Sequence, residues 1–160
     1  MRPLIAALVT ACCAISWPTK ADSVSDAVRV MALNMYHEAR GEGRIGMIAV
    51  GWVVLNRMAD PAYPASVRGV VYQGCQFSWV CDRRSDRPRD GRAWRKALQL
   101  AAVMLSKPVP DPTRGALWYH ATRIKRPNLG SPVTTAARIG RHVFYVRAVR
   151  RVPLVEVASR

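Results

Sequence analysis

Acidic residues are scarce in this chain. Of its 160 residues, 10 are acidic and 25 are lysine or arginine, which gives a formal net charge of +15. Such a chain favours polyanionic partners, and nucleic acid, acidic lipid and a carboxylate-bearing cell wall all qualify on charge alone. Only three of the acidic residues are glutamates, and two of them, Glu38 and Glu42, lie in one heptapeptide. That heptapeptide is the first place to look for chemistry.

Long hydrophobic runs are also absent. A membrane-spanning helix needs about 20 apolar residues, and the runs 4–15 and 45–55 are both shorter. The first run follows the basic Arg2 and precedes a small-residue cleavage site at residues 19–21, which is the pattern of a secretory signal peptide. An uncleaved signal anchor and a lipoprotein signal that ends at Cys12 are the alternatives.

The expected domain layout follows from this signal. We expect a signal peptide over residues 1–21, one domain over residues 22–150 and a basic tail over residues 151–160. A single domain is expected because a chain of this size builds one core. The mature protein is then periplasmic or secreted, and export argues against nucleic acid as its working partner.

Cysteine is rare beyond the signal segment. Only Cys75 and Cys81 occur there, with five residues between them. In an oxidising compartment this pair favours a disulfide, because a zinc site would need more ligands at matching spacing. Two free buried thiols are the weaker alternative.

The sequence lacks a zinc-protease signature. The dipeptide His37-Glu38 begins like that motif, but Gly41 stands where the second histidine should be. His37, His120 and His142 could still meet in space as the zinc triad of an amidase. Single histidines are more often hydrogen-bonded structural residues, so we expect no metal and no cofactor.

Helical periodicity dominates what is present. Apolar spacing, with Ser23 or Ser25 as the first cap and Asp90 as the last, predicts helices over residues 23–39, 45–58, 66–73 and 90–105. The first two should form a hairpin whose connection carries the acidic heptapeptide. The last helix should bury a stripe made of Trp94, Ala97, Leu98, Ala101, Ala102 and Leu105.

Two short strand-like runs complete the pattern. Residues 116–120 and 142–146 could pair into a small sheet, the second of them after a turn at 138–141, and residues 123–131 indicate a surface loop. The expected fold class is α+β, mostly helical with a small β element.

Glu38 conflicts with ordinary helix chemistry. It follows Met31 by seven residues, so it points within about 20° of the apolar face of the first helix. It also lies near the C-terminus of that helix, where a negative charge opposes the helix dipole. A carboxyl in an apolar setting, with a like charge at Glu42, is held neutral near pH 7, as a general acid requires. A surface ion pair with Arg40 or Arg44 is the alternative.

Five segments occur together in an order found in one known family. They are Tyr36-His37-Glu38-Ala39-Arg40-Gly41-Glu42, Gly46 to Asn56-Arg57, Gln76-Phe77-Ser78-Trp79, Tyr119-His120 and Ile139-Gly140-Arg141-His142-Val143-Phe144-Tyr145. In these segments the chain resembles the SleB/CwlJ cell-wall hydrolase family over about residues 28–146. The resemblance implies a lysozyme-like catalytic domain that acts on peptidoglycan glycan strands, with Glu38 as its catalytic acid.

The resemblance further implies cleavage between N-acetylmuramic acid and N-acetylglucosamine by a lytic transglycosylase, in which one glutamate serves as acid and base. A hydrolytic route would need a second carboxylate, for which Asp82 is the candidate. For Glu42 two roles are open: it could support the catalytic residue, or it could form an ordinary salt bridge in the loop. An N-acetylmuramoyl-L-alanine amidase and a non-catalytic cationic wall-binding protein remain the alternatives. The expected partners are glycan strands and the anionic envelope surface, bound by a monomer.

Flat hydrophobic faces for sugar rings occur outside the long helices, on Phe77, Trp79, Trp118 and Tyr119. Gln76, Ser78 and Tyr119 could donate hydrogen bonds to acetamido groups. Trp52, inside the second helix, is expected in the core. The expected substrate-binding set comprises Tyr36, Glu42, Gln76, Phe77, Ser78, Trp79, Tyr119 and His120.

Overall fold

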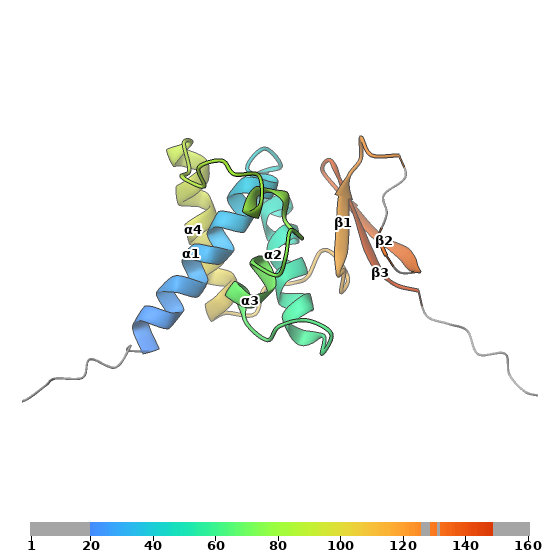
Figure 1. Cartoon of the computed structure of the whole chain (residues 1–160), viewed down its shortest axis with the longest axis horizontal. Helices are drawn as coiled ribbons and strands as arrows, with labels where there is room; N and C mark the ends of the chain where they lie inside the picture. The colour runs from blue at the N-terminus through green and yellow to red at the C-terminus, as the bar shows by residue number, and fades with distance from the viewer. Residues whose placement is uncertain (1–19, 126–128, 131, 149–160) are drawn as a thin grey trace, which may run out of the picture.

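The computed structural model of the chain describes residues 20–125, 129–130 and 132–148. The expected signal segment up to residue 19 and the expected basic tail lie outside these ranges. Helices form one side of the molecule and a three-stranded sheet forms the other, with α2 between them (Figure 1). This arrangement confirms the mostly helical α+β class. Within the described ranges, no helix is both long and apolar enough to cross a membrane.

The first two helices form the expected hairpin. Helix α1 covers Lys20–Ala39, which begins earlier than the serine caps suggest, and α2 covers Gly43–Ala59. Every residue of α1 from 30 to 36 is buried, because α2, α3 and α4 all pack against this helix. Helix α2 is mostly buried, although Ile45 at its start is 55% exposed. Trp52 is partly buried against the helical core, as expected.

Side-chain caps define the starts of the two remaining α-helices. The Ser66 hydroxyl accepts from the Gly69 amide ahead of α3, which covers Val67–Val71. The Asp90 carboxylate accepts from two amides at the start of α4, which covers Gly91–Ser106. The Asp90 cap and a short helix near residues 66–73 were predicted from the sequence, whereas the Ser66 cap was not; both caps depend on local chemistry.

The buried face of α4 differs from the predicted stripe. Ala97 and Ala101 are buried as expected, but Ala102 is exposed. The buried residues are Ala93, Ala97, Leu100, Ala101 and Met104. The face is rotated because α4 packs against both α1 and α2, and Met104 fits against the bare backbone of Gly51.

The sheet contains one strand more than expected. The paired strands are β1 (Trp118–Ala121) and β3 (His142–Arg147), and β2 (Val133–Ile139) adds to the other edge of β3, so that the antiparallel order is β1-β3-β2. The predicted pairing of the two short runs is confirmed, with Tyr119 opposite Phe144. The expectation of a turn at 138–141 was wrong for its first two residues, which belong to β2.

The sheet packs against α2 through a small second core. Ala49 and Val53 of α2 meet Ala116 and Phe144, and all four are fully buried. Small side chains on α2 allow the sheet to approach closely. This packing places the face of β1 that carries Tyr119 beside the C-terminal end of α1, where Glu38 lies.

Candidate active site

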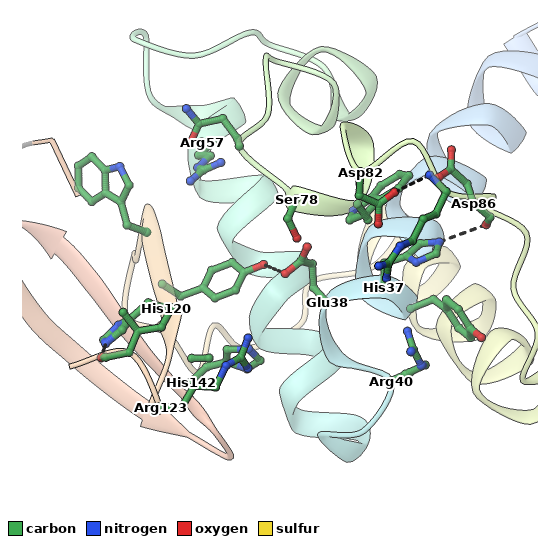
Figure 2. A pocket seen from close by; sticks show the side chains of 18 of the residues that line it. His37, Glu38, Arg40, Arg57, Ser78, Asp82, Asp86, His120, Arg123 and His142 are labelled. Carbon is green, nitrogen blue, oxygen red and sulfur yellow. Dashed lines mark hydrogen bonds between the residues drawn. The ribbon is translucent and has the colours of Figure 1, made fainter. Parts of the chain in front are cut away.

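Glu38 lies at the centre of a cavity of about 1370 Å³. The segment from Gln76 to Asp90 forms one wall, and residues of β1 and its following turn, together with His142, form the other. Figure 2 shows the carboxylate between these walls, with Ser78 directed toward it. The prediction that this side chain turns toward the interior is consistent with its partial burial.

Burial governs the chemistry of Glu38. Desolvation raises the pKa of its carboxyl, and only part of this effect is offset by a hydrogen bond from Tyr119 and by the nearby His37. The Tyr119 hydroxyl donates to Oε2 of Glu38 at 2.9 Å. The result is a carboxyl that holds its proton to higher pH than an ordinary glutamate, with a donor fixed on one oxygen.

Tyr119 is itself held in place. Burial and the charge of Glu38 raise the pKa of its hydroxyl well above the usual value, so the group remains a neutral donor. The ring of His142 meets the Tyr119 ring edge to face at 5.2 Å, and Phe144 packs at 5.5 Å. Burial also lowers the pKa of His142, which favours a neutral imidazole beside the tyrosine.

Glu42 does not line the main cavity. Its side chain is 7% exposed and accepts from the Arg141 amide at 2.9 Å and from the Arg141 guanidinium at 2.7 Å. Burial alone would raise the pKa of Glu42, but the hydrogen bonds and charge of Arg141 outweigh it and lower the pKa. Glu42 therefore ties the α1–α2 connection to the turn before β3, and with Glu38 it lines a smaller cavity of about 260 Å³, so its expected contact with substrate stays a prediction.

Two residues just before Glu38 hold the facing wall. The Tyr36 hydroxyl accepts from the amides of Arg89 and Asp90 at 3.0 and 2.9 Å. A ring nitrogen of His37 donates to the Asp86 carbonyl at 3.1 Å. Tyr36 is 4% exposed, so it borders the cavity but its hydroxyl is already engaged with the wall.

The tetrapeptide 76–79 contributes three of its four side chains to the cavity. Gln76, Ser78 and Trp79 line it. Trp79 is 5% exposed, because His37 stacks on its ring at 4.8 Å and its indole donates to Asn34. The tryptophan thus presents little free surface.

Phe77 is not at the cavity. It is 2% exposed and belongs to the helical core, so the expectation that it offers a face to a sugar ring is wrong. The 3-10 helix η1 (Ser78–Val80) begins directly after it, and this turn directs Ser78 toward the cavity while Phe77 faces inward. The disulfide between Cys75 and Cys81, predicted from their isolation, closes this segment.

The remaining expected contacts lie on β1. Trp118, Tyr119 and His120 all line the cavity. The ring Nε2 of His120 donates a hydrogen bond to the Ile124 carbonyl at 3.0 Å, and this bond fixes the turn after β1. Within the described ranges, no three His, Cys, Asp or Glu side chains are grouped so that they could hold a metal ion.

Arg57 was not among the expected site residues. It is 4% exposed, and burial lowers the pKa of its guanidinium. Its Nε donates to the Leu117 carbonyl at 2.8 Å, and its guanidinium lies over the rings of Tyr63 and Phe77 at 5.3 and 5.4 Å. Arg57 therefore fixes the residue ahead of β1 to α2. An arginine within an apolar helix is the sequence signal that could have identified it.

A partly buried glutamate between a helical layer and a small antiparallel sheet is the arrangement of a lysozyme-like catalytic domain. The chain belongs to the cell wall hydrolase family, whose model matches residues 41–145 and so begins three residues after Glu38. The family expected from the sequence is thereby confirmed.

Relatives and solved structures support this assignment. The spore cortex-lytic enzyme of Halalkalibacterium halodurans is 32% identical over 117 residues, or 73% of this chain and 34% of that protein. The enzyme of the same name in Bacillus subtilis is 33% identical over 121 residues, or 73% of this chain and 36% of that protein. The chain thus spans about a third of the length of these curated relatives.

Two solved structures share the fold. The catalytic domain of the Bacillus cereus SleB protein has a TM-score of 0.60 and 27% identity, covering 76% of this chain and 91% of that one. The catalytic domain of the germination-specific lytic transglycosylase SleB from Bacillus anthracis has a TM-score of 0.57 and 27% identity, covering 76% and 94%.

Proposed function

We propose that this protein degrades peptidoglycan by cleaving the glycan strand between N-acetylmuramic acid and N-acetylglucosamine, as a lytic transglycosylase. The observation that carries the proposal is Glu38, a carboxyl whose pKa is raised by burial and whose Oε2 accepts from Tyr119 at the centre of a large cavity. The names of the relatives and the solved structures support it.

In the proposed reaction Glu38 is first an acid and then a base. Its protonated carboxyl gives a proton to the glycosidic oxygen, so that the bond from the muramic C1 to that oxygen breaks and N-acetylglucosamine leaves with a free hydroxyl. The resulting carboxylate accepts the proton of the muramic 6-hydroxyl, whose oxygen bonds to C1. An anhydro ring forms, no water is consumed, and Glu38 returns to its protonated state.

Two of the other carboxylates are engaged within the protein, which favours the single-glutamate route. Glu42 is paired with Arg141, and Asp82 accepts from the Arg84 amide on the facing wall. Hydrolysis would instead require a carboxylate that places water against the sugar, and Asp82 borders the cavity as a candidate. The nature of the product therefore separates the two routes.

The test is digestion of purified peptidoglycan in 18O-labelled water, with fragments identified by mass spectrometry. Anhydromuropeptides without 18O from the wild type, and their absence with Glu38→Gln, are the expected result. Reducing muropeptides that contain one 18O and depend on Asp82 would replace the proposal by hydrolysis. Release of free stem peptides would indicate an amidase, and no fragments would indicate a wall-binding protein.

We also propose that the protein acts in the periplasm or outside the cell. The Cys75–Cys81 disulfide supports this placement, because such bonds persist in oxidising compartments. Cell fractionation with an antibody against the chain tests it, and recovery of the protein in the cytosol with both thiols reduced would contradict it.

A further inference from the structure

The cavity around Glu38 has an excess of positive charge. The arginines that line it are Arg40, Arg57, Arg84, Arg87, Arg89 and Arg123. The acidic residues that line it are Glu38, Asp82, Asp86 and Asp90. Six cationic groups thus face four carboxyls within the described lining, and the excess grows when Glu38 holds its proton.

Among the described residues, no arginine that lines the cavity forms an ion pair within the protein, although the charge of Arg40 helps to lower the pKa of Asp90. The three ion pairs found among the described residues belong to Arg68, Arg141 and Arg147, none of which lines the main cavity. Two acidic side chains of the same wall accept from backbone amides instead. Asp82 accepts from the Arg84 amide, and Asp90 accepts from the first amides of α4.

Three of these arginines lie on the wall that faces β1. Arg84, Arg87 and Arg89 are exposed to solvent and follow one another at two- and three-residue spacing. Arg123, also exposed, lies on the opposite wall, where Figure 2 shows it across the cavity from Asp82 and Asp86. Guanidinium groups thus flank Glu38 on both sides.

The backbone of this wall is tied to the helix that carries Glu38. The disulfide closes one end of the wall, and the Tyr36 hydroxyl binds the amides of Arg89 and Asp90 at the other. His37 holds the middle through the Asp86 carbonyl. Because Tyr36 and His37 directly precede Glu38, the backbone that carries the arginines is tied to the segment that carries the reacting carboxyl. A wall whose backbone is already ordered reduces the entropic cost of binding.

We propose that Arg84, Arg87 and Arg89, with Arg123 opposite, bind the carboxylates of the peptide stems that muramic residues carry, so that the enzyme selects peptide-bearing glycan. The planar guanidinium matches a carboxylate with two parallel hydrogen bonds. The volume of about 1370 Å³ leaves room for a stem beside the sugars, since it exceeds the roughly 300–1,000 Å³ of an ordinary small-molecule site. This inference rests on the proposed function and names its substrate class.

The test compares two substrates made from one peptidoglycan preparation that has been freed of other anionic wall polymers. One keeps its stem carboxylates, and in the other they are converted to neutral amides. The wild type should cleave the native substrate at least about threefold faster in kcat/KM, because one exposed guanidinium–carboxylate pair contributes less than a tenfold factor but several can act together.

A charge-matched pair of variants separates specific from general attraction. The variant Arg84→Gln/Arg87→Gln/Arg89→Gln should lose the preference for the native substrate. The control Arg29→Gln/Arg95→Gln/Lys107→Gln removes the same charge from exposed residues that line neither cavity, and it should keep the preference. Thermal melting of both variants checks that each remains folded.

Two results would overturn the inference while leaving the proposed function intact. One is equal cleavage of native and amidated glycan by the wild type. The other is an equal loss of preference in the control variant, which would mean that net charge alone attracts the wall. If instead neither substrate yields glycan fragments, the proposed function fails and this inference fails with it.

Discussion

The contact between Gly140 and Glu42 gives a prediction whose size follows from the structure. Gly140 has a φ of +54°, in the left-handed region, and a Cβ built there would overlap Oε2 of Glu42. That oxygen accepts from the Arg141 amide. Gly140→Ala should therefore strain the turn and also displace the carboxylate that ties the turn to the α1–α2 connection.

Gly74→Ala provides the matched control. Gly74 has a φ of +57°, and nothing lies within 4 Å of a Cβ built there. Gly74→Ala should be destabilised only by the cost of holding an alanine in the left-handed conformation, about 1–2 kcal/mol. Gly140→Ala should be destabilised by the same cost and also by loss of the hydrogen bond from the Arg141 amide to the Glu42 carboxylate. That hydrogen bond contributes about 1.5 kcal/mol or more. The ion pair adds at most about 1 kcal/mol, because the Arg141 side chain is 75% exposed.

The assay is thermal unfolding followed by circular dichroism. The two variants should differ by about 2–3 kcal/mol, or about 10 °C in Tm for a chain of this size. The double variant Gly140→Ala/Glu42→Ala should be far more stable than the sum of its single changes predicts, because the overlap is gone. Equal losses in Gly140→Ala and Gly74→Ala, or strict additivity in the double variant, would refute the reasoning.

Three further changes test the site and the core. Tyr119→Phe removes the hydrogen bond that lowers the pKa of Glu38, so the alkaline limb of the pH–rate profile should move to higher pH; an unmoved limb would contradict Glu38 as the acid. Because burial raises the folded-state pKa of Glu38 above its ordinary value of 4.5, the contribution of Glu38 to wild-type stability should fall as the pH rises from that value through the folded pKa, and should stay lower above it. Glu38→Gln should therefore be the more stable protein at pH 7 in denaturant titrations, with the difference lost below pH 4.5; an equal difference at both pH values would be evidence against burial as its cause. Phe77→Ala should lose about 3–5 kcal/mol on urea unfolding, as expected for a core phenylalanine, whereas a sugar platform would lose activity with its stability intact.

Local chemistry explains what the sequence could predict. Asp90 caps α4 as expected, since a cap depends only on the next few residues. The inward direction of Glu38 followed from helical periodicity. Strand β2 was missed because Thr134 and Thr135 are exposed and a bulge follows them, so no alternation of apolar residues marks it.

Long-range contacts explain which features of the site the sequence could not predict. Tyr119 meets Glu38 across 81 positions of sequence, and the pairing of Glu42 with Arg141 spans 99. Tyr119 and Arg141 cannot be identified as the partners of these glutamates until the position of the sheet against α2 is known. Phe77 and Ser78 show the same limit at short range, because the geometry of one 3-10 turn decides which of the two faces the core.

The most direct test of the central claim is the turnover of purified peptidoglycan by the wild type, Glu38→Gln and Asp82→Asn, counted as new anhydro ends. We expect a loss of about 10²–10⁴-fold in Glu38→Gln, as for removal of a general acid, with anhydro products retained in Asp82→Asn. Near-normal turnover by a folded Glu38→Gln variant would contradict it.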